Sequence, residues 1–75
     1  MRKISKDDIY KCIRTINTSN AKLIRLLAVR DLTLDEYRLM RLNNQLIGEL
    51  ELYLEEELLT KNVVKVVSEV MGYEF

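Results

Sequence analysis

The chain has 75 residues, of which twelve are basic and twelve are acidic, with one cysteine and neither histidine nor proline. This length predicts a single domain over residues 1–75, with a core of barely sufficient size. One cysteine excludes a disulfide framework, and the lack of histidine excludes zinc sites and histidine-dependent catalysis. The composition therefore predicts no enzyme, no metal site and no cofactor.

Two features of the sequence indicate where the protein is found. Met1-Arg2-Lys3 leads into a polar sequence, whereas a secretory signal continues into an apolar run. The apolar stretches are only a few residues long, far below the ~20 residues needed to cross a bilayer. Together with the lone thiol, these features predict a cytoplasmic protein without membrane contact.

The first predicted helix covers residues 5–16. Ser5 and Asp8 have the spacing of a capping box. The apolar residues that follow recur with a helical period: Ile9, Cys12, Ile13 and Ile16. Because Cys12 falls on this apolar stripe, we interpret it as a small core residue, with a reactive nucleophile as the alternative.

The sequence Asn17-Thr18-Ser19-Asn20 is typical of a turn and predicts a break in the helix. A second helix is then expected at about residues 21–30. Its buried face is predicted to consist of Leu23, Ile24 and Leu27, with Leu26 as a further candidate. The short Asp31-Leu32 link favours a sharp corner between this helix and the next.

The longest predicted helix covers about residues 34–59, and Thr33 with Glu36 forms a capping box at its start. Its apolar residues fall within an arc of about 160°. A helix of ~26 residues is a rod of about 39 Å, long for a chain of this size. The sequence therefore predicts an all-α fold, a small bundle of three to four helices organised around one long helix.

Residues 61–72 allow two interpretations. The valines follow a helical spacing, with Asn62 as the expected N-cap and Gly72 where a C-terminal cap belongs. A Val-Val-Lys-Val-Val sequence is also typical of a strand. We favour the helix because the alternation expected of a strand fails.

The wide apolar arc of the long helix predicts self-association, because two short helices do not need so wide a face. We expect a homodimer with the long helices antiparallel or crossed, since a second copy is the simplest cover for so small a chain. The predicted dimer or partner interface consists of Tyr37, Leu39, Leu42, Asn43, Leu46, Leu50, Tyr53 and Leu54.

The polar members of this predicted interface have two interpretations each. Asn43 is either a buried amide that sets the register of a helix pair or a residue at the wet edge of the arc. Tyr37 and Tyr53 are either interface anchors or residues that border the core.

Charge is divided unevenly between the two parts of the chain. Residues 1–30 carry eight basic and two acidic side chains, whereas residues 31–75 carry four basic and ten acidic ones. The basic part could bind the phosphates of a nucleic acid. Alternatively, its helices face the acidic helix within one molecule or across a dimer. The residues predicted to contact nucleic acid are Lys11, Arg14, Lys22, Arg25 and Arg30.

Two short resemblances concern DNA-associated proteins. Val-Val-Ser-Glu-Val-Met-Gly-Tyr, residues 66–73, resembles the first helix and turn of the AraC-type DNA-binding domain, without its reading helix. The order of helices, with Asp31-Leu32-Thr33-Leu34-Asp35-Glu36 and Gly48-Glu49-Leu50, is similar to the Hha/YmoA family of small nucleoid-associated modulators. The chain lacks that family's aromatic-rich, histidine-containing third helix. This second resemblance implies regulation by binding an oligomeric DNA-associated protein.

These observations predict a small regulatory protein that acts by contact with another protein, as an adaptor, an anti-factor or a phage- or plasmid-type inhibitor. The alternative is a DNA-binding transcriptional or nucleoid-associated regulator that uses the basic N-terminal half of the chain.

Overall fold

The computed structural model describes residues 4–72, and every regular element in that range is an α-helix. The helices are α1, Lys6–Leu27, α2, Leu34–Glu56, and α3, Lys61–Met71. The all-α class and the small helical bundle are thereby confirmed. Met1-Arg2-Lys3, on which the expectation about secretion depended, lies outside the described residues.

The predicted turn at Asn17-Thr18-Ser19-Asn20 is wrong, because α1 runs through it without a break. Small polar residues favour turns when their side chains bond to nearby backbone outside a helix. Here the Thr18 hydroxyl donates to the carbonyl oxygen of Arg14 one turn earlier, at 3.0 Å, a bond that the helix accommodates. Ser19 and Asn20 bond instead to side chains of α2. The two short N-terminal helices are therefore one helix of 22 residues.

Helix α2 begins as predicted and ends earlier than predicted. Both bonds of the capping box between Thr33 and Glu36 are present. The helix stops at Glu56 rather than Leu59, because Glu57 adopts the left-handed conformation with φ of 55°. Three successive glutamates at the negative end of the helix dipole oppose its extension.

Helix α3 confirms the helical interpretation of the valine-rich segment. Its N-cap is Thr60 rather than Asn62, because the Thr60 hydroxyl accepts from the backbone N–H of Val63 at 3.1 Å. The Asn62 amide donates to Glu49 on α2 at 3.0 Å. Gly72 ends the helix in the left-handed conformation, as its position predicted.

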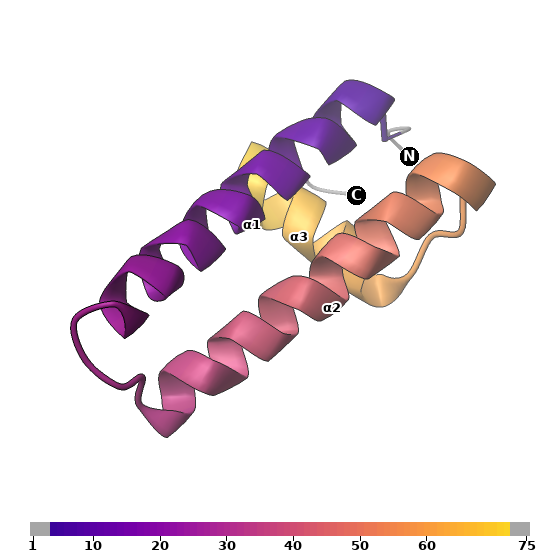
Figure 1. Ribbon diagram of the computed structural model, residues 1–75. Coiled ribbons are helices and arrows are strands. Elements are labelled where there is room, and N and C mark those ends of the chain that lie inside the picture. Colours follow the sequence, from indigo (N-terminus) through magenta and orange to yellow (C-terminus); the bar gives the residue numbers. More distant parts are fainter. Residues whose placement is uncertain (1–3, 73–75) are drawn as a thin grey trace.

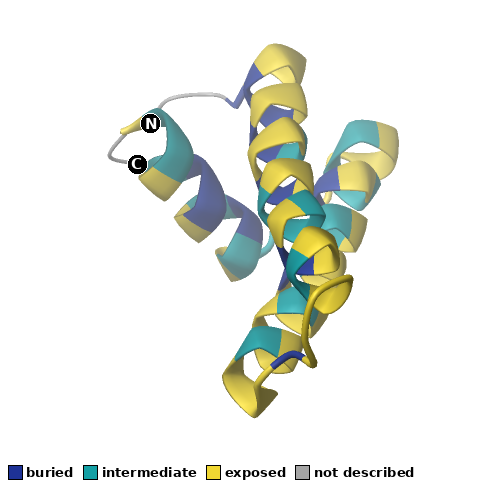
Figure 2. Cartoon of the chain, turned by 60° about the vertical axis from the view of Figure 1, so that its left-hand side comes forward, coloured by how far each residue is buried: buried dark blue, intermediate teal, exposed yellow. Residues whose placement is uncertain are grey.

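The three helices form a bundle that is complete at one end only. Helices α1 and α2 lie antiparallel, and α3 crosses behind the end that holds the start of α1 and the end of α2 (Figure 1). The opposite end, with the loop between α1 and α2, extends beyond α3; we call it the tip. Buried residues gather where α3 meets the pair, whereas exposed residues predominate around the loop (Figure 2).

The main core lies at the three-helix end. It combines residues from all three helices and from the segment before α1: Ile4, Ile9, Cys12, Ile16, Leu50, Val63, Val66 and Val67. Half-buried side chains such as Leu46, Tyr53 and Leu54 pack against it. Toward the tip, burial falls to Leu23 on α1 and Leu32 in the loop.

A polar layer separates these two regions. The amide of Asn43, which is only 6% exposed, donates to Ser19 Oγ at 3.1 Å and to Asn20 Oδ1 at 2.9 Å. Asn20 donates in turn to Asn44 Oδ1 at 3.0 Å. A satisfied polar layer inside an apolar seam disfavours sliding of one helix along the other. The structure thus places Asn43 in a buried seam within one chain, rather than at a wet edge.

Candidate functional site

Chemically reactive groups do not gather anywhere in residues 4–72. That range contains no cluster of three or more side chains able to hold a metal ion. Cys12 is fully buried, and burial, followed by the nearby charge of Asp8, raises the pKa of its thiol. A buried thiol with a raised pKa is a poor nucleophile, which fits the interpretation of Cys12 as a core residue.

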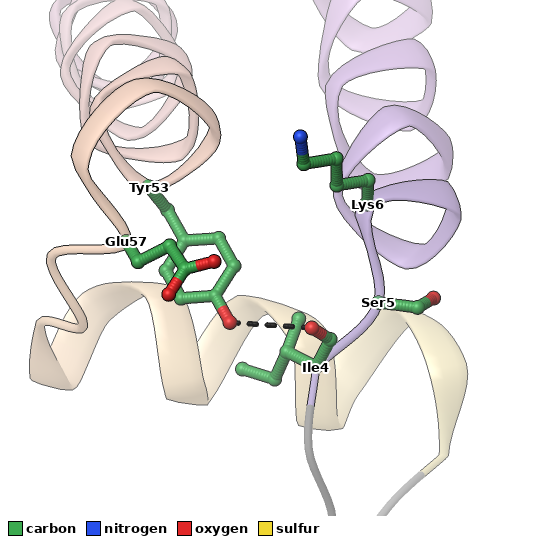
Figure 3. Close-up of a pocket in the computed structure, with 5 residues that line it drawn as sticks. All are labelled: Ile4, Ser5, Lys6, Tyr53 and Glu57. Carbon is green, nitrogen blue, oxygen red and sulfur yellow. Dashed lines mark hydrogen bonds between the residues drawn. The ribbon is translucent and has the colours of Figure 1, made fainter.

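A surface hollow of about 420 Å³ lies beside the start of α1 and is lined by Ile4, Ser5, Lys6, Tyr53 and Glu57 (Figure 3). The Tyr53 hydroxyl donates to the backbone carbonyl of Ile4 at 3.2 Å and so ties the N-terminal segment to α2. Ser5 serves as the N-cap of α1, accepting from Asp8 N–H at 3.2 Å. These contacts hold the fold together, and the lining offers no nucleophile paired with a base.

The structure divides the eight residues predicted to form an interface into two groups. Asn43 and Leu50 are buried, and Leu46, Tyr53 and Leu54 pack against the core. These five residues therefore make contacts within the single chain. Tyr53 borders the core, as one of its two interpretations proposed. The three residues nearest the tip remain exposed: Tyr37, Leu39 and Leu42.

Sequence reasoning missed four further exposed apolar residues at the tip. Ile24 and Leu27 were expected to be buried but are 61% and 45% exposed. Leu23 is buried as expected and Leu26, the further candidate, is half-buried, so the buried face of this part of α1 is narrower than predicted. Val29 and Leu34, beside the loop, are 79% and 64% exposed. Apolar residues within and beside a turn were the signal that could have identified them.

Together these residues form the tip cluster, the candidate functional site. Its members are large apolar side chains between residues 24 and 42, all at least 43% exposed: Ile24, Leu27, Val29, Leu34, Tyr37, Leu39 and Leu42. Single exposed apolar residues are ordinary on protein surfaces. Seven around two helix ends and one loop are more than folding requires, and such groupings mark interaction sites.

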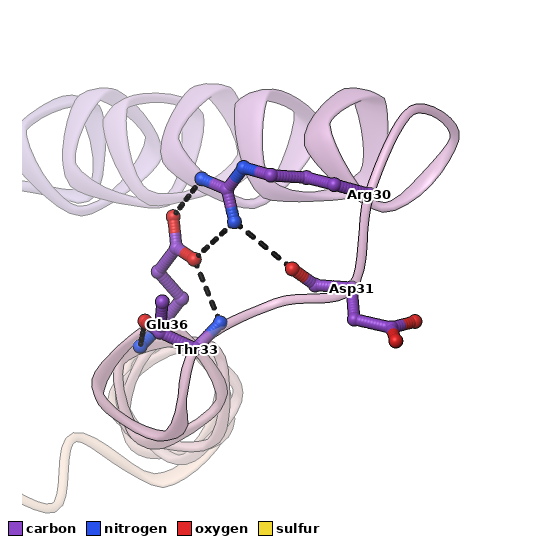
Figure 4. A network of polar contacts seen from close by, with 4 residues as sticks. All are labelled: Arg30, Asp31, Thr33 and Glu36. Atoms are coloured by element: carbon purple, nitrogen blue, oxygen red, sulfur yellow. Dashed lines mark hydrogen bonds and ion pairs between the residues drawn. The ribbon is translucent and has the colours of Figure 1, made fainter.

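A polar network holds the loop of the tip in place (Figure 4). The Arg30 guanidinium donates to both carboxylate oxygens of Glu36, at 2.8 and 2.9 Å, and to the carbonyl of Asp31 at 3.0 Å. Glu36 also accepts from the backbone N–H of Thr33 at 2.8 Å. These bonds, led by the one from Arg30, lower the pKa of Glu36 to about 2. The network thus fixes the loop that joins the two helix ends carrying the tip cluster.

The residues predicted to contact nucleic acid also fall into two groups, those that are free to bind and one that is not. Lys11, Arg14, Lys22 and Arg25 are exposed, and their spacing along the continuous α1 places them within an arc of about 80°. The line they form is about 21 Å long. Arg30 is excluded from it, because Glu36 occupies its guanidinium.

Comparisons with other proteins identify no relative: no protein family, no characterised protein and no solved structure matches this chain. The two resemblances read from the sequence therefore gain no support from a family match. Among the described residues, no helix is long and apolar enough to cross a membrane.

Proposed function

We propose that this protein is a small intracellular regulator that acts by contact with another protein through the tip cluster, and that it works as a homodimer. The observation that carries the proposal is the exposure of seven large apolar side chains at the end of the molecule that α3 leaves uncovered. Exposing them costs solubility and adds little to the core, so binding to a partner explains their presence.

The charges beside the tip cluster indicate the partner's chemistry. Lys22 and Arg25 are exposed on the last turns of α1 and have no ion-pair partner within residues 4–72. This cationic border runs along α1, whereas the exposed Asp31 and Asp35 lie at the start of α2. The α1 side fits a partner that presents apolar side chains bordered by acids, because complementary charge guides association. An adaptor, an anti-factor or an inhibitor would use such a surface to occupy part of its target.

A triple substitution at the tip tests this proposal. Ile24→Ser, Val29→Ser and Leu34→Ser together remove the three most exposed apolar side chains of the cluster. Each variant would be used to capture partners from cells that make the protein. We expect the wild-type chain to capture one partner reproducibly and the triple variant to capture none. The thermal stability of the triple variant should equal that of the wild-type chain.

The matched control places the same kind of change at the other end of the molecule. Tyr10→Ser, Leu58→Ser and Leu59→Ser alter apolar side chains that are about half exposed and lie away from the tip. This control should retain the partner. Loss of the partner in both triple variants, or in neither, would contradict a role for the tip cluster.

The aligned cations of α1 support one alternative function, binding of nucleic acid through the phosphate backbone. Such binding depends on releasing counterions, so it is strongest at low salt. Replacing Arg14, Lys22 and Arg25 by Ala should then abolish retention on nonspecific duplex DNA at ~50 mM salt. If the wild-type chain is not retained under these conditions, this alternative is wrong.

A further inference from the structure

Helix α2 contains a glycine that no turn or close contact within residues 4–72 of its own chain requires. Gly48 lies in the middle of the helix, where glycine is unfavourable compared with alanine. Its backbone angle is helical, and a Cβ atom added there would meet no atom within 4 Å. Neither a turn nor a close contact within the described residues therefore explains it. A helix that lacks a side chain at one exposed point allows another backbone to approach closely there.

Charged residues are arranged about Gly48 with opposite signs on its two sides. Arg41 lies seven residues before it and Glu55 seven residues after it, so all three fall on one side of α2. Each charge is about 10.5 Å from the glycine along the helix axis. Both side chains are exposed, and neither has an ion-pair partner among residues 4–72.

This arrangement of charges is complementary to a second copy of the helix that runs in the opposite direction. A two-fold axis at Gly48 places Arg41 of one copy against Glu55 of the other, and Glu55 against Arg41. The neighbouring positions Gln45 and Glu51 are related by the same axis, as are Asn44 and Leu52. A parallel arrangement would instead bring like charges together.

We propose that two copies of this chain dimerise through the outer face of α2, with the helices antiparallel and closest at Gly48. The proposal rests on the homodimer in the proposed function and deepens it by naming the surface and the direction. Gly48 supplies close backbone contact, and the two Arg41–Glu55 pairs select the antiparallel direction, because charge pairs contribute more to specificity than to affinity.

The proposed symmetry also leaves both tip clusters accessible to partner proteins. With the axis at Gly48, Glu57 of one copy lies opposite Leu39 of the other, so the first turn of α2 and the loop extend beyond the partner's helix. The two tips then point in opposite directions. Such a dimer offers two binding surfaces for partner proteins, one at each end.

Charge reversal tests the direction of the helices. Arg41→Glu alone and Glu55→Arg alone each create two like-charge contacts in the dimer, and each should weaken dimerisation about tenfold or more. An equimolar mixture of the two variants restores both pairs in a heterodimer, and so should recover wild-type mass by light scattering. Arg14→Glu, the same reversal on α1, is the control and should leave the mass unchanged.

Substitution of the glycine tests the close approach. Gly48→Leu should raise the helical content of an isolated chain, where a Cβ at this position meets no atom within 4 Å, yet it should block the dimer. A wild-type mass of one chain at ~100 μM would overturn the homodimer itself. A dimer that persists in both Arg41→Glu and Gly48→Leu would overturn only the surface proposed here. The tip variant measures partner binding separately, so failure of that function remains distinguishable.

Discussion

The two ends of this bundle are built from similar residues but differ in how far those residues are buried. At the three-helix end, Leu50 and Val67 are fully buried against α1 and against each other's helices. At the tip, Leu34 and Leu39 belong to the same helix as Leu50, yet about half of each side chain is exposed. The difference is the presence of α3, which covers only one end of the α1–α2 pair. Burial in the core therefore accounts for the apolar residues at one end, and the proposed binding of a partner would account for the exposed ones at the other.

The largest expected effect contrasts these two ends directly. Leu50→Ala removes a fully buried side chain and should lower the free energy of unfolding by about 2–5 kcal/mol. Leu39→Ala, the control on the same helix, should change it by about 0.5 kcal/mol or less. Chemical denaturation of both variants measures the difference. Equal losses would show that the tip belongs to the folding core.

The polar layer between the ends gives the next prediction. Asn43→Ala removes a buried amide and leaves the half-buried Ser19 and Asn20 without their bonds to it, and should cost about 1–3 kcal/mol of unfolding free energy. Asn44→Ala, at an exposed position in the same layer, should cost far less. Thermal unfolding of the two variants makes the comparison, and an equal cost would argue against a buried role for Asn43.

The end of α2 offers a stabilising change. Glu57 is the only non-glycine residue with positive φ in the described range, a conformation that glycine adopts without strain. Glu57→Gly should therefore raise the free energy of unfolding by up to about 1 kcal/mol. Glu56→Gly, one residue earlier and still in the helix, should lower it by a similar amount. A destabilised Glu57→Gly chain would contradict the assigned end of the helix.

The smallest effect concerns the network at the tip. The pKa of Glu36 falls from its ordinary 4.5 to about 2 on folding, so its carboxylate stabilises the fold above about pH 4.5. That stabilisation should disappear as the pH falls toward 2, because both states then bind the proton. The difference in Tm between the wild-type chain and Glu36→Gln should shrink over this range. Glu51→Gln is the control for loss of one exposed charge, and a difference independent of pH would contradict the network.

Local signals in the sequence predicted the ends of helices correctly where each signal was compatible with only one structure. The capping box at Thr33 and Glu36 and the glycine at position 72 both mark real helix ends. The turn at residues 17–20 failed because its polar side chains bond across to α2, a partner that local spacing does not reveal. Asn62 failed as a cap because Thr60, two residues earlier, offers the same chemistry.

The candidate site was harder to predict for a related reason. Periodicity shows which side of a helix is apolar, but it does not show how far along the helix a third element extends. Leu42 and Leu50 belong to the same predicted apolar arc, yet Leu42 is 47% exposed, whereas Leu50 is fully buried in the core that α3 helps to form. The four aligned cations of α1 also became visible only once the helix proved continuous.

We propose that this chain works in association with other chains, as a dimer that presents two tips. The most direct test is the mass of the wild-type protein by light scattering across a concentration series up to ~100 μM. We expect the mass to rise from the 8.9 kDa of one chain to twice that value. A mass that stays at 8.9 kDa throughout the series would contradict it.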